Sequence, residues 1–471
     1  MSAPALLQTT RRLLDRRAAT LQSTGRIPSL VTGVVRDSHL VWSSARGTFP
    51  DGVDPLDLQY RIGSITKTFV AVGLMQLRDA GRLRLNDRLE DHLPGTPFGD
   101  RTLAQLLTHT AGITAELPGS WWERSPGADR DAMHAALTRD AVLDRPGRRF
   151  HYSNIAFAVL GEVLATHTGQ RWDEAITERI LQPLQMRRTT ARPQPPHATG
   201  YAVHPYADVL MPEAVQDTGA MAPAGQLWST LGELSTWAAF LAGDTAEVLS
   251  PDTLAEMCEP TQVTGEDWTG ARGLGLQLQR QGGQGRGRHG RGGQGLGGRV
   301  LVGHGGSMPG FQAAVRVDRA DRTGTVMLLN CTTPSAVDGL EDPFDILAEY
   351  EPRIPEPWVA AADVPEQLLA LTGSWFWGTS EGILRVLGDG SLKIEHVSGM
   401  MPTSRFDRAD AGADTWIGRE ADFRGETMRV IRGTDGTVTH LEIATYVLTR
   451  RPYQPGEVIP GGLDAGSWPT T

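Results

Sequence analysis

The segment YRIGSITKTF (residues 60–69) places a serine and a lysine three residues apart, Ser64 and Lys67. Apolar residues recur at near-helical spacing through this segment and Gly81 supplies a stop, so a helix is predicted over residues 64–80. Positions i and i+3 share a helix face, which brings the serine hydroxyl within reach of the lysine amine. Free N–H groups at a helix start also suit a developing oxyanion. The segment predicts an activated nucleophile, with an N-cap serine beside a solvated lysine as the alternative.

Lysine is rare in this chain, and its rarity bears on Lys67. Of the 45 Lys and Arg residues only Lys67 and Lys393 are lysine, which leaves 43 arginines. An arginine guanidinium does not give up its proton in a protein, whereas a desolvated lysine ammonium can. Lys67 is therefore a candidate for proton transfer, with chance placement as the alternative.

Two further segments carry polar groups that suit acyl transfer. HYSN (151–154) precedes an apolar stretch of helical character, and it offers Tyr152 as a proton carrier and Asn154 as a donor to a substrate carbonyl. GHGGS (303–307) follows a strand-like run, and it presents the imidazole of His304 among glycines that let a substrate backbone approach. Each segment taken singly has an alternative interpretation. For HYSN it is an aromatic anchor with an N-cap Asn, and for GHGGS it is a glycine-rich turn with an incidental histidine.

The three motifs in this order resemble those of the penicillin-recognising serine hydrolases. The branch of class C β-lactamases, their esterase relatives and D-amino-acid peptidases is the most similar. The flanks LLTHTAGI (106–113) and APAGQLWST (222–230) fit as well, and the resemblance covers roughly residues 25–335. It implies a β-lactamase/transpeptidase-like α+β fold. The element order agrees, because a strand hairpin at 28–48 and later antiparallel strands flank a helical middle.

The resemblance also implies roles for single residues. Ser64 becomes the acylated nucleophile, with Lys67 and Tyr152 as general base and then general acid, and Asn154 holds the substrate amide. No metal or organic cofactor is expected.

On the third motif the resemblance implies an oxyanion hole. The backbone N–H of Ser64 is expected to act there together with that of Gly306 or Ser307. Gly305 is expected to leave room for the substrate backbone, and His304 to complete the catalytic group.

Two features depart from the family's best-known members. These usually carry Lys-Thr-Gly or Lys-Ser-Gly at the third motif, whereas His304 offers at best a weaker, pH-dependent charge. The N-terminal segment lacks the apolar core of a signal peptide, and no apolar run is long enough to span a membrane. A cytoplasmic protein without a membrane partner is therefore expected, and a β-lactamase or cell-wall carboxypeptidase is disfavoured.

Composition and the positions of proline and glycine predict the domain organisation. A chain of 471 residues with 39% hydrophobic residues predicts several globular domains, and the net charge of −10 argues against nucleic acid as a partner. Four prolines mark residues 351–366 as a linker between a catalytic domain (1–350) and a second domain (367–471). Strand patterns with Asp-Gly turns predict that the second domain is all-β, either a small barrel or a strongly curved sheet. The Gly/Arg-rich segment 282–298 is expected to be a mobile loop.

The appended β domain and the absent export signal resemble the penicillin-binding-protein-type thioesterases, which are nonribosomal peptide cyclases. The resemblance implies that a peptidyl thioester is taken onto Ser64 and released as a head-to-tail macrolactam, with a carrier-protein domain as a further partner. A lipocalin-like barrel over the site would exclude water, which favours aminolysis. Hydrolysis by a D-stereospecific peptidase, amidase or esterase is the alternative, and a β-lactamase or a non-catalytic acyl-accepting sensor is less favoured.

Four more residues are candidates for substrate binding. Trp121 and Trp122 are predicted to form a wall of the acyl pocket, with anchoring of their loop as the alternative. Arg450 and Arg451 are predicted to point to opposite sides of a strand, so that one of them reaches the site and meets a peptide terminus.

Overall fold

The computed structural model divides the chain into two compact units, Met1–Arg353 and Ile354–Thr471. The division falls inside the proline-rich segment 351–366. Most of the Gly/Arg-rich segment, residues 282–297, lies outside the described residues. The structure describes residues 5–265, 269–281, 298–332, 342–355, 357–361, 363–397, 402–410, 414–454 and 456–461.

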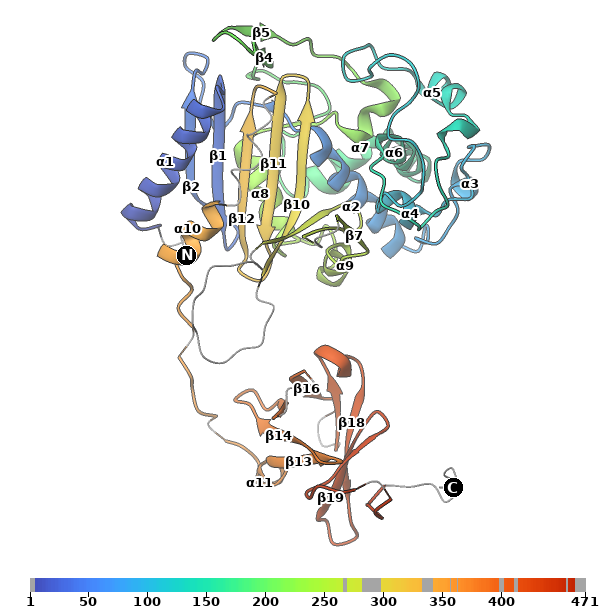
Figure 1. The fold of residues 1–471 in the computed structure, drawn as a ribbon, viewed down its shortest axis with the longest axis vertical. Helices are drawn as coiled ribbons and strands as arrows, with labels where there is room; N and C mark the ends of the chain where they lie inside the picture. Colours follow the sequence, from blue (N-terminus) through green and yellow to red (C-terminus); the bar gives the residue numbers. More distant parts are fainter. Residues whose placement is uncertain are drawn as a thin grey trace. The chain divides into compact units, whose positions relative to one another are not determined.

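The first unit is built on an eight-stranded antiparallel sheet with the strand order β2-β1-β12-β11-β10-β9-β8-β7 (Figure 1). The predicted α+β fold and the hairpin at 28–48 are confirmed. The residue pattern of GLGLQLQR (273–280) is typical of one strand, but only its second half belongs to β9, because the chain turns at Gly275, whose φ is +74°. The strands are β1 (Ser29–Arg36), β2 (His39–Gly47), β7 (Gln262–Thr264), β8 (Gly270–Arg272), β9 (Gln277–Gln281), β10 (Arg299–Met308), β11 (Phe311–Asp318) and β12 (Thr323–Leu329).

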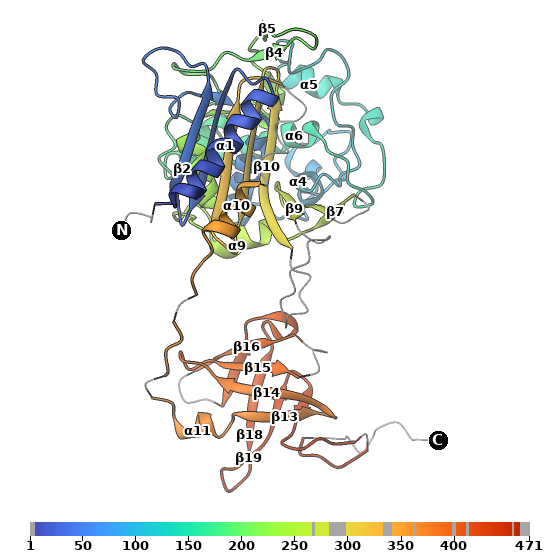
Figure 2. The ribbon, with the colours of Figure 1, turned by 60° about the vertical axis from the view of Figure 1, so that its left-hand side comes forward.

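Helices cover both faces of this sheet, because neighbouring residues of β1 point to opposite sides. Val34 packs in a cluster with α1 (Gln8–Thr24) and α10 (Asp342–Tyr350), whereas Val35 belongs to the large core that includes α8 (Leu231–Leu241). Figure 2 shows α1 and α10 lying together against one face of the sheet.

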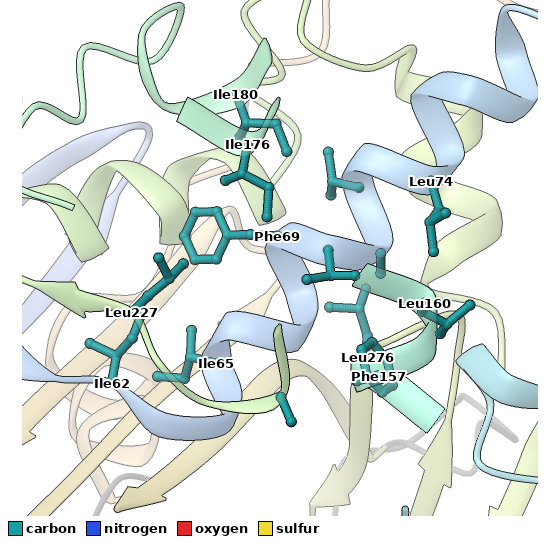
Figure 3. Close-up of a cluster of buried hydrophobic side chains, with 14 of the residues drawn as sticks. Ile62, Ile65, Phe69, Leu74, Phe157, Leu160, Ile176, Ile180, Leu227 and Leu276 are labelled. Atoms are coloured by element: carbon teal, nitrogen blue, oxygen red, sulfur yellow. The ribbon is translucent and has the colours of Figure 1, made fainter. Parts of the chain in front are cut away.

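Behind the sheet the helical subdomain surrounds α2 (Thr66–Asp79), the helix that begins just after Ser64. Eleven of its 14 residues are buried, so α2 is enclosed on nearly all sides and forms a rigid support for the site. Figure 3 shows Phe69 of α2 beside Ile176 of α7 (Trp172–Ile176) and Leu227, within the same buried cluster. Burial of each such side chain contributes about 1.5–3 kcal/mol.

The apolar helix α6 (Asn154–Thr168) positions the second motif. Its N-cap is Ser153, whose hydroxyl accepts from the backbone N–H of Ala156, so the reading of Asn154 as the N-cap is wrong. This leaves the Asn154 side chain free to point into the site. The remaining elements of the first unit are β3 (Tyr60–Arg61), β4 (Tyr201–Val203), β5 (Leu210–Pro212), β6 (Trp228–Ser229), α3 (Leu89–His92), α4 (Leu103–Leu107), α5 (Arg130–Ala136), α7 (Trp172–Ile176) and α9 (Pro251–Met257).

The second unit is an antiparallel eight-stranded barrel, as the sequence predicts. Its strands follow chain order from β13 to β20, and Phe376 and Thr449 close the ring by exchanging backbone hydrogen bonds of 2.7 and 2.9 Å. Trp375, Phe406 and Trp416 lie in its buried core. The elements are α11 (Glu366–Leu369), β13 (Gly373–Trp377), β14 (Ser380–Val386), β15 (Leu392–His396), β16 (Ser404–Arg408), β17 (Thr415–Gly418), β18 (Thr427–Arg432), β19 (Val438–Ile443) and β20 (Tyr446–Leu448).

Candidate active site

Ser64 lies in a short 3₁₀ turn (Gly63–Ile65) that leads directly into α2. Its Oγ accepts a hydrogen bond of 2.9 Å from Nζ of Lys67, so the structure brings together the pair that the sequence predicts. Gly63 has a φ of +52°, and a Cβ on it would lie 2.6 Å from the backbone N of Ser307. The turn therefore needs glycine both for its conformation and for its contact with β10.

The predicted oxyanion donors meet at this contact. A Cβ on Gly306 would lie 1.9 Å from the carbonyl oxygen of Ile62 and 3.0 Å from the backbone N of Ser64. Strand β10 thus runs against the nucleophile turn at a separation that only glycine permits. The backbone N–H groups of Ser64 and Ser307 lie on the two sides of the contact, where two donors can serve one oxyanion.

Lys67 is fully buried, and three oxygen atoms surround its amine. Besides Ser64, Nζ donates to Oδ1 of Asn154 at 2.7 Å and to the carbonyl oxygen of Ala224 at 2.6 Å. Burial, opposed in part by the charges of Glu116 and Glu123, lowers the pKa of Lys67 to about 7. A substantial fraction of this lysine is therefore the free amine near neutral pH, the form that accepts a proton.

Acylation is expected to depend on pH through Lys67. Because the pKa of Lys67 is about 7, the neutral amine is scarce below that pH and predominates above it. We expect kcat/KM to rise about tenfold per pH unit below neutrality and to level off above it. A profile measured from about pH 5 to 9 checks this, and an activity still rising at the upper end would contradict it.

Tyr152 lies between the nucleophile and two histidines. Its hydroxyl is hydrogen-bonded to Ser64, its ring stacks on His109 with centroids 4.3 Å apart, and the ring of His304 lies 6.3 Å away. Burial raises the pKa of Tyr152 and outweighs the opposing charge of Arg272. The phenol therefore keeps its proton, as a general acid must.

Glu116 is a residue of the site that the sequence did not reveal. Its Oε1 accepts from Nδ2 of Asn154 at 2.5 Å, and its Oε2 accepts from the indole N–H of Trp122 at 2.6 Å. The carboxylate binds the NH₂ end of the amide, so the amide oxygen faces Lys67. Both ends of the Asn154 amide are occupied in this arrangement. No sequence motif identifies Glu116, because it lies in a loop and comes next to Asn154 only when the chain folds.

Replacement of Glu116 by glutamine tests this positioning. The charge of Glu116 raises the pKa of Lys67, so its removal should move the rise in activity to lower pH. We expect kcat to fall about tenfold, since the amide of Asn154 is no longer fixed. The measurement is the pH profile of Glu116→Gln beside that of Glu90→Gln, which loses an exposed ion pair with Arg88. An unshifted profile would contradict the role given to Glu116.

His304 is 2% exposed, and its Nδ1 lies 2.5 Å from the carbonyl oxygen of Gly305. Burial, followed by the charges of Arg272 and Lys67, holds the pKa of His304 well below its usual value. The imidazole is neutral, which corrects the expectation that it offers a pH-dependent charge. The positive charge that was expected from His304 is carried instead by Arg272. Its Cζ lies 4.8 Å from the ring centroid of Phe150 and 5.9 Å from that of Tyr152. Arginine is so common in this chain that nothing singled this one out.

The two tryptophans have different surroundings. Trp122 is 8% exposed and joins the main core, so its loop is anchored there as the alternative holds. Trp121 is 57% exposed, and Cζ of Arg124 lies 4.5 Å from its ring centroid. The wall of the acyl pocket stays a prediction for both tryptophans.

Arg450 and Arg451 belong to the second unit. Arg450 donates to the carbonyl oxygens of Thr372 and Ser374 at 2.8 and 3.3 Å, and its Cζ lies 3.9 Å from the ring centroid of Trp375. Arg451 is exposed. The predicted contact of one of these arginines with a peptide terminus stays a prediction.

Among the residues that the structure describes, no three His, Cys, Asp or Glu side chains gather as metal ligands would. Within the same part of the chain, no helix combines the length and the apolar character needed to cross a membrane.

The hydrogen-bonded Ser64, Lys67 and Tyr152 lie between the antiparallel sheet and the buried helix α2, an arrangement chemically suited to acyl transfer through a serine. Residues 14–349 match the family model described as Beta-lactamase. The chain belongs to the β-lactamase family. Residues 364–450 match a second model, which describes a domain of unknown function, DUF7586.

Relatives and solved structures fit this assignment. The chain is 30% identical to the D-alanyl-D-alanine-carboxypeptidase/endopeptidase AmpH of Escherichia coli over 43% of this chain and 54% of AmpH. The chain spans about half the length of the curated relatives it matches. A D-stereospecific amidohydrolase from Streptomyces sp. is 26% identical with a TM-score of 0.56, over 72% of this chain and 97% of that one. SurE with D-Leu shares the fold at 22% identity and a TM-score of 0.55, over 94% of this chain and 100% of that one.

Proposed function

We propose that this chain transfers the acyl group of a peptide-like amide, ester or thioester onto Ser64. The observation that carries the proposal is the 2.9 Å hydrogen bond between Ser64 and a buried Lys67 whose pKa is about 7. The neutral amine takes the serine proton while Oγ attacks the carbonyl carbon. The N–H groups of Ser64 and Ser307 stabilise the oxyanion. The bond to the leaving group then breaks, and the leaving atom takes the proton of Tyr152, which Lys67 replaces.

The names of two relatives support a substrate whose acyl group ends in a D-residue. AmpH is named for D-alanyl-D-alanine cleavage, and the Streptomyces amidohydrolase is named D-stereospecific. We therefore propose a short peptide with a D-residue before the scissile bond as the acyl donor.

For the acyl group on Ser64 we propose release by the peptide's own N-terminal amine as a macrolactam. This rests on the sequence resemblance to the penicillin-binding-protein-type thioesterases. The likeness in fold to SurE, which extends over 94% of this chain, supports it because the barrel is included. A carrier-protein partner and a cytoplasmic location remain parts of this proposal.

Hydrolysis is the second candidate fate. The 26% identity to the D-stereospecific amidohydrolase, over 97% of that chain, favours it. The acyl-enzyme is the same, and only the acceptor differs: water gives an acid, whereas an amine gives an amide.

One experiment distinguishes the two fates. A linear peptide thioester that ends in a D-residue is incubated with the enzyme, and protein and product are weighed by mass spectrometry. A product that has lost only the thiol indicates cyclisation, and one that has also gained water indicates hydrolysis. The acyl-transfer proposal is wrong if no adduct forms on Ser64 and if Ser64→Ala leaves product formation unchanged.

A further inference from the structure

A cavity of about 410 Å³ lies beside α6, apart from the catalytic group. Its walls come from α5, α6 and α7, which Figure 1 labels, and from the 3₁₀ helix Gly219–Ala224. None of the residues assigned to the catalytic group lines it. The lining residue Gly161 lies about 10 Å along α6 from Asn154, at 1.5 Å per residue. The cavity is therefore a separate space with the volume of a small-molecule site.

The inner surface of this cavity is mainly apolar. Toward the catalytic group it is closed by Pro223, because a Cβ on Gly161 would lie 2.3 Å from Cγ of this proline. The proline ring thus rests directly on α6. Water on such a surface is displaced favourably by an apolar ligand. The apolar lining residues are Met133, Ala158, Ala165, Trp172, Ala220 and Pro223.

Three arginines from different segments, Arg130, Arg171 and Arg192, stand at the mouth of the cavity. Their side chains are 64%, 62% and 75% exposed, whereas Glu162 and Asp173, which pair with the first two, are largely buried. Each arginine pairs with a carboxylate through only part of its guanidinium. Nη1 of each has no hydrogen-bond partner in the described part of the chain. The mouth can therefore offer further donors to a negatively charged group.

The same cavity contacts the segment that holds the catalytic lysine. Pro223 lines it, and the carbonyl oxygen of the next residue, Ala224, accepts from Nζ of Lys67 at 2.6 Å. Gln226 also lines it, and its Oε1 accepts from Nη2 of Arg61 at 2.7 Å. A ligand that binds one arrangement of this segment better than another is therefore coupled to the position of Lys67.

We propose that this cavity is a second ligand site, which binds an organic anion with an apolar body, and that its occupancy changes the rate of acylation through Ala224. The apolar body fills the interior, and the anionic group meets the arginines, whose planar guanidinium matches a carboxylate in geometry and charge. A cationic amphiphile of the same length would meet like charges at the mouth. The binding of the anion is independent of the proposed function, whereas the effect on rate rests on it.

Calorimetric titration of the full chain with decanoate tests the binding. We expect decanoate to bind at least about tenfold more tightly than decyltrimethylammonium. Ala165→Phe fills the cavity and should weaken decanoate binding at least about tenfold, whereas Thr166→Phe adds the same ring at the next, exposed residue and should not. The double variant Arg171→Gln and Arg192→Gln should also weaken binding about tenfold. Arg148→Gln, which removes an exposed charge outside the cavity, should leave binding unchanged.

The effect on rate is measured at saturating substrate. Decanoate should change kcat at least about fivefold, and Ala165→Phe should remove this response. Thermal unfolding of each variant identifies loss of the fold.

The outcomes that would overturn the inference differ for its two parts. Undiminished binding in Ala165→Phe would place decanoate elsewhere on the chain, and equal affinity for the cationic amphiphile would exclude an anion site. An effect on KM alone would indicate competition at Ser64 and would refute the coupling. Labelling of Ser64 by an activated ester tests the acyl-transfer proposal separately. Unlabelled wild type would refute that proposal and leave the binding result standing.

Discussion

Lys67→Arg should lower kcat/KM by at least about a thousandfold, although the substitution preserves the formal charge. The reason lies in the proton that the buried amine must accept. Burial lowers the pKa of Lys67 to about 7, whereas a guanidinium stays protonated under any condition in which the protein is folded. The variant would keep a cation beside Ser64 and lose the base. Single-turnover acylation, followed by the mass of the Ser64 adduct, measures this directly.

The chain contains its own control for this substitution. Lys393, the other lysine, lies on β15 and pairs with Glu395 at 2.7 Å near the surface. Lys393→Arg should therefore leave acylation unchanged. A guanidinium is larger than an ammonium and Lys67 is fully buried, so unfolding temperatures are compared as well. If Lys67→Arg acylates at the wild-type rate, Lys67 is not the base.

The parts of the site that could be predicted from the sequence are those fixed by local spacing. Ser64 and Lys67 share one helix start, and the residues of the third motif share one strand, so their mutual placement follows from helix and strand geometry. Asn154 adjoins α6, a helix evident from its apolar residues. These segments come together because the core around α2 is continuous.

The parts that could not be predicted depend on contacts between distant segments. Glu116 reaches Asn154 across a loop, and Arg272 reaches Tyr152 from the far end of the sheet. Neither residue type nor spacing distinguishes them from other glutamates and arginines. The ionisation states of site residues could not be predicted from the sequence either. Residue type alone suggests a pH-dependent charge on His304, whereas burial, a property of the folded chain, lowers the pKa of His304 and raises that of Tyr152.

Gly306→Ala should reduce acylation by about a hundred- to a thousandfold, because one methyl group forces β10 away from the nucleophile turn. The added Cβ would lie 1.9 Å from the carbonyl oxygen of Ile62, a backbone atom that cannot rotate aside. The strand or the turn must shift, and either movement separates the N–H groups of Ser64 and Ser307.

Gly305 provides the matched comparison on the same strand. A Cβ there would lie 3.7 Å from the guanidinium of Arg316, an ordinary contact, so Gly305→Ala should lose much less activity. Burst amplitudes and the mass of the acyl adduct measure both variants, with thermal unfolding as a check on the fold. Equal losses in the two variants would mean that crowding of the substrate, rather than separation of the oxyanion donors, accounts for the effect. A larger loss in Gly306→Ala would tie catalysis to the close approach of β10 and the turn that holds Ser64.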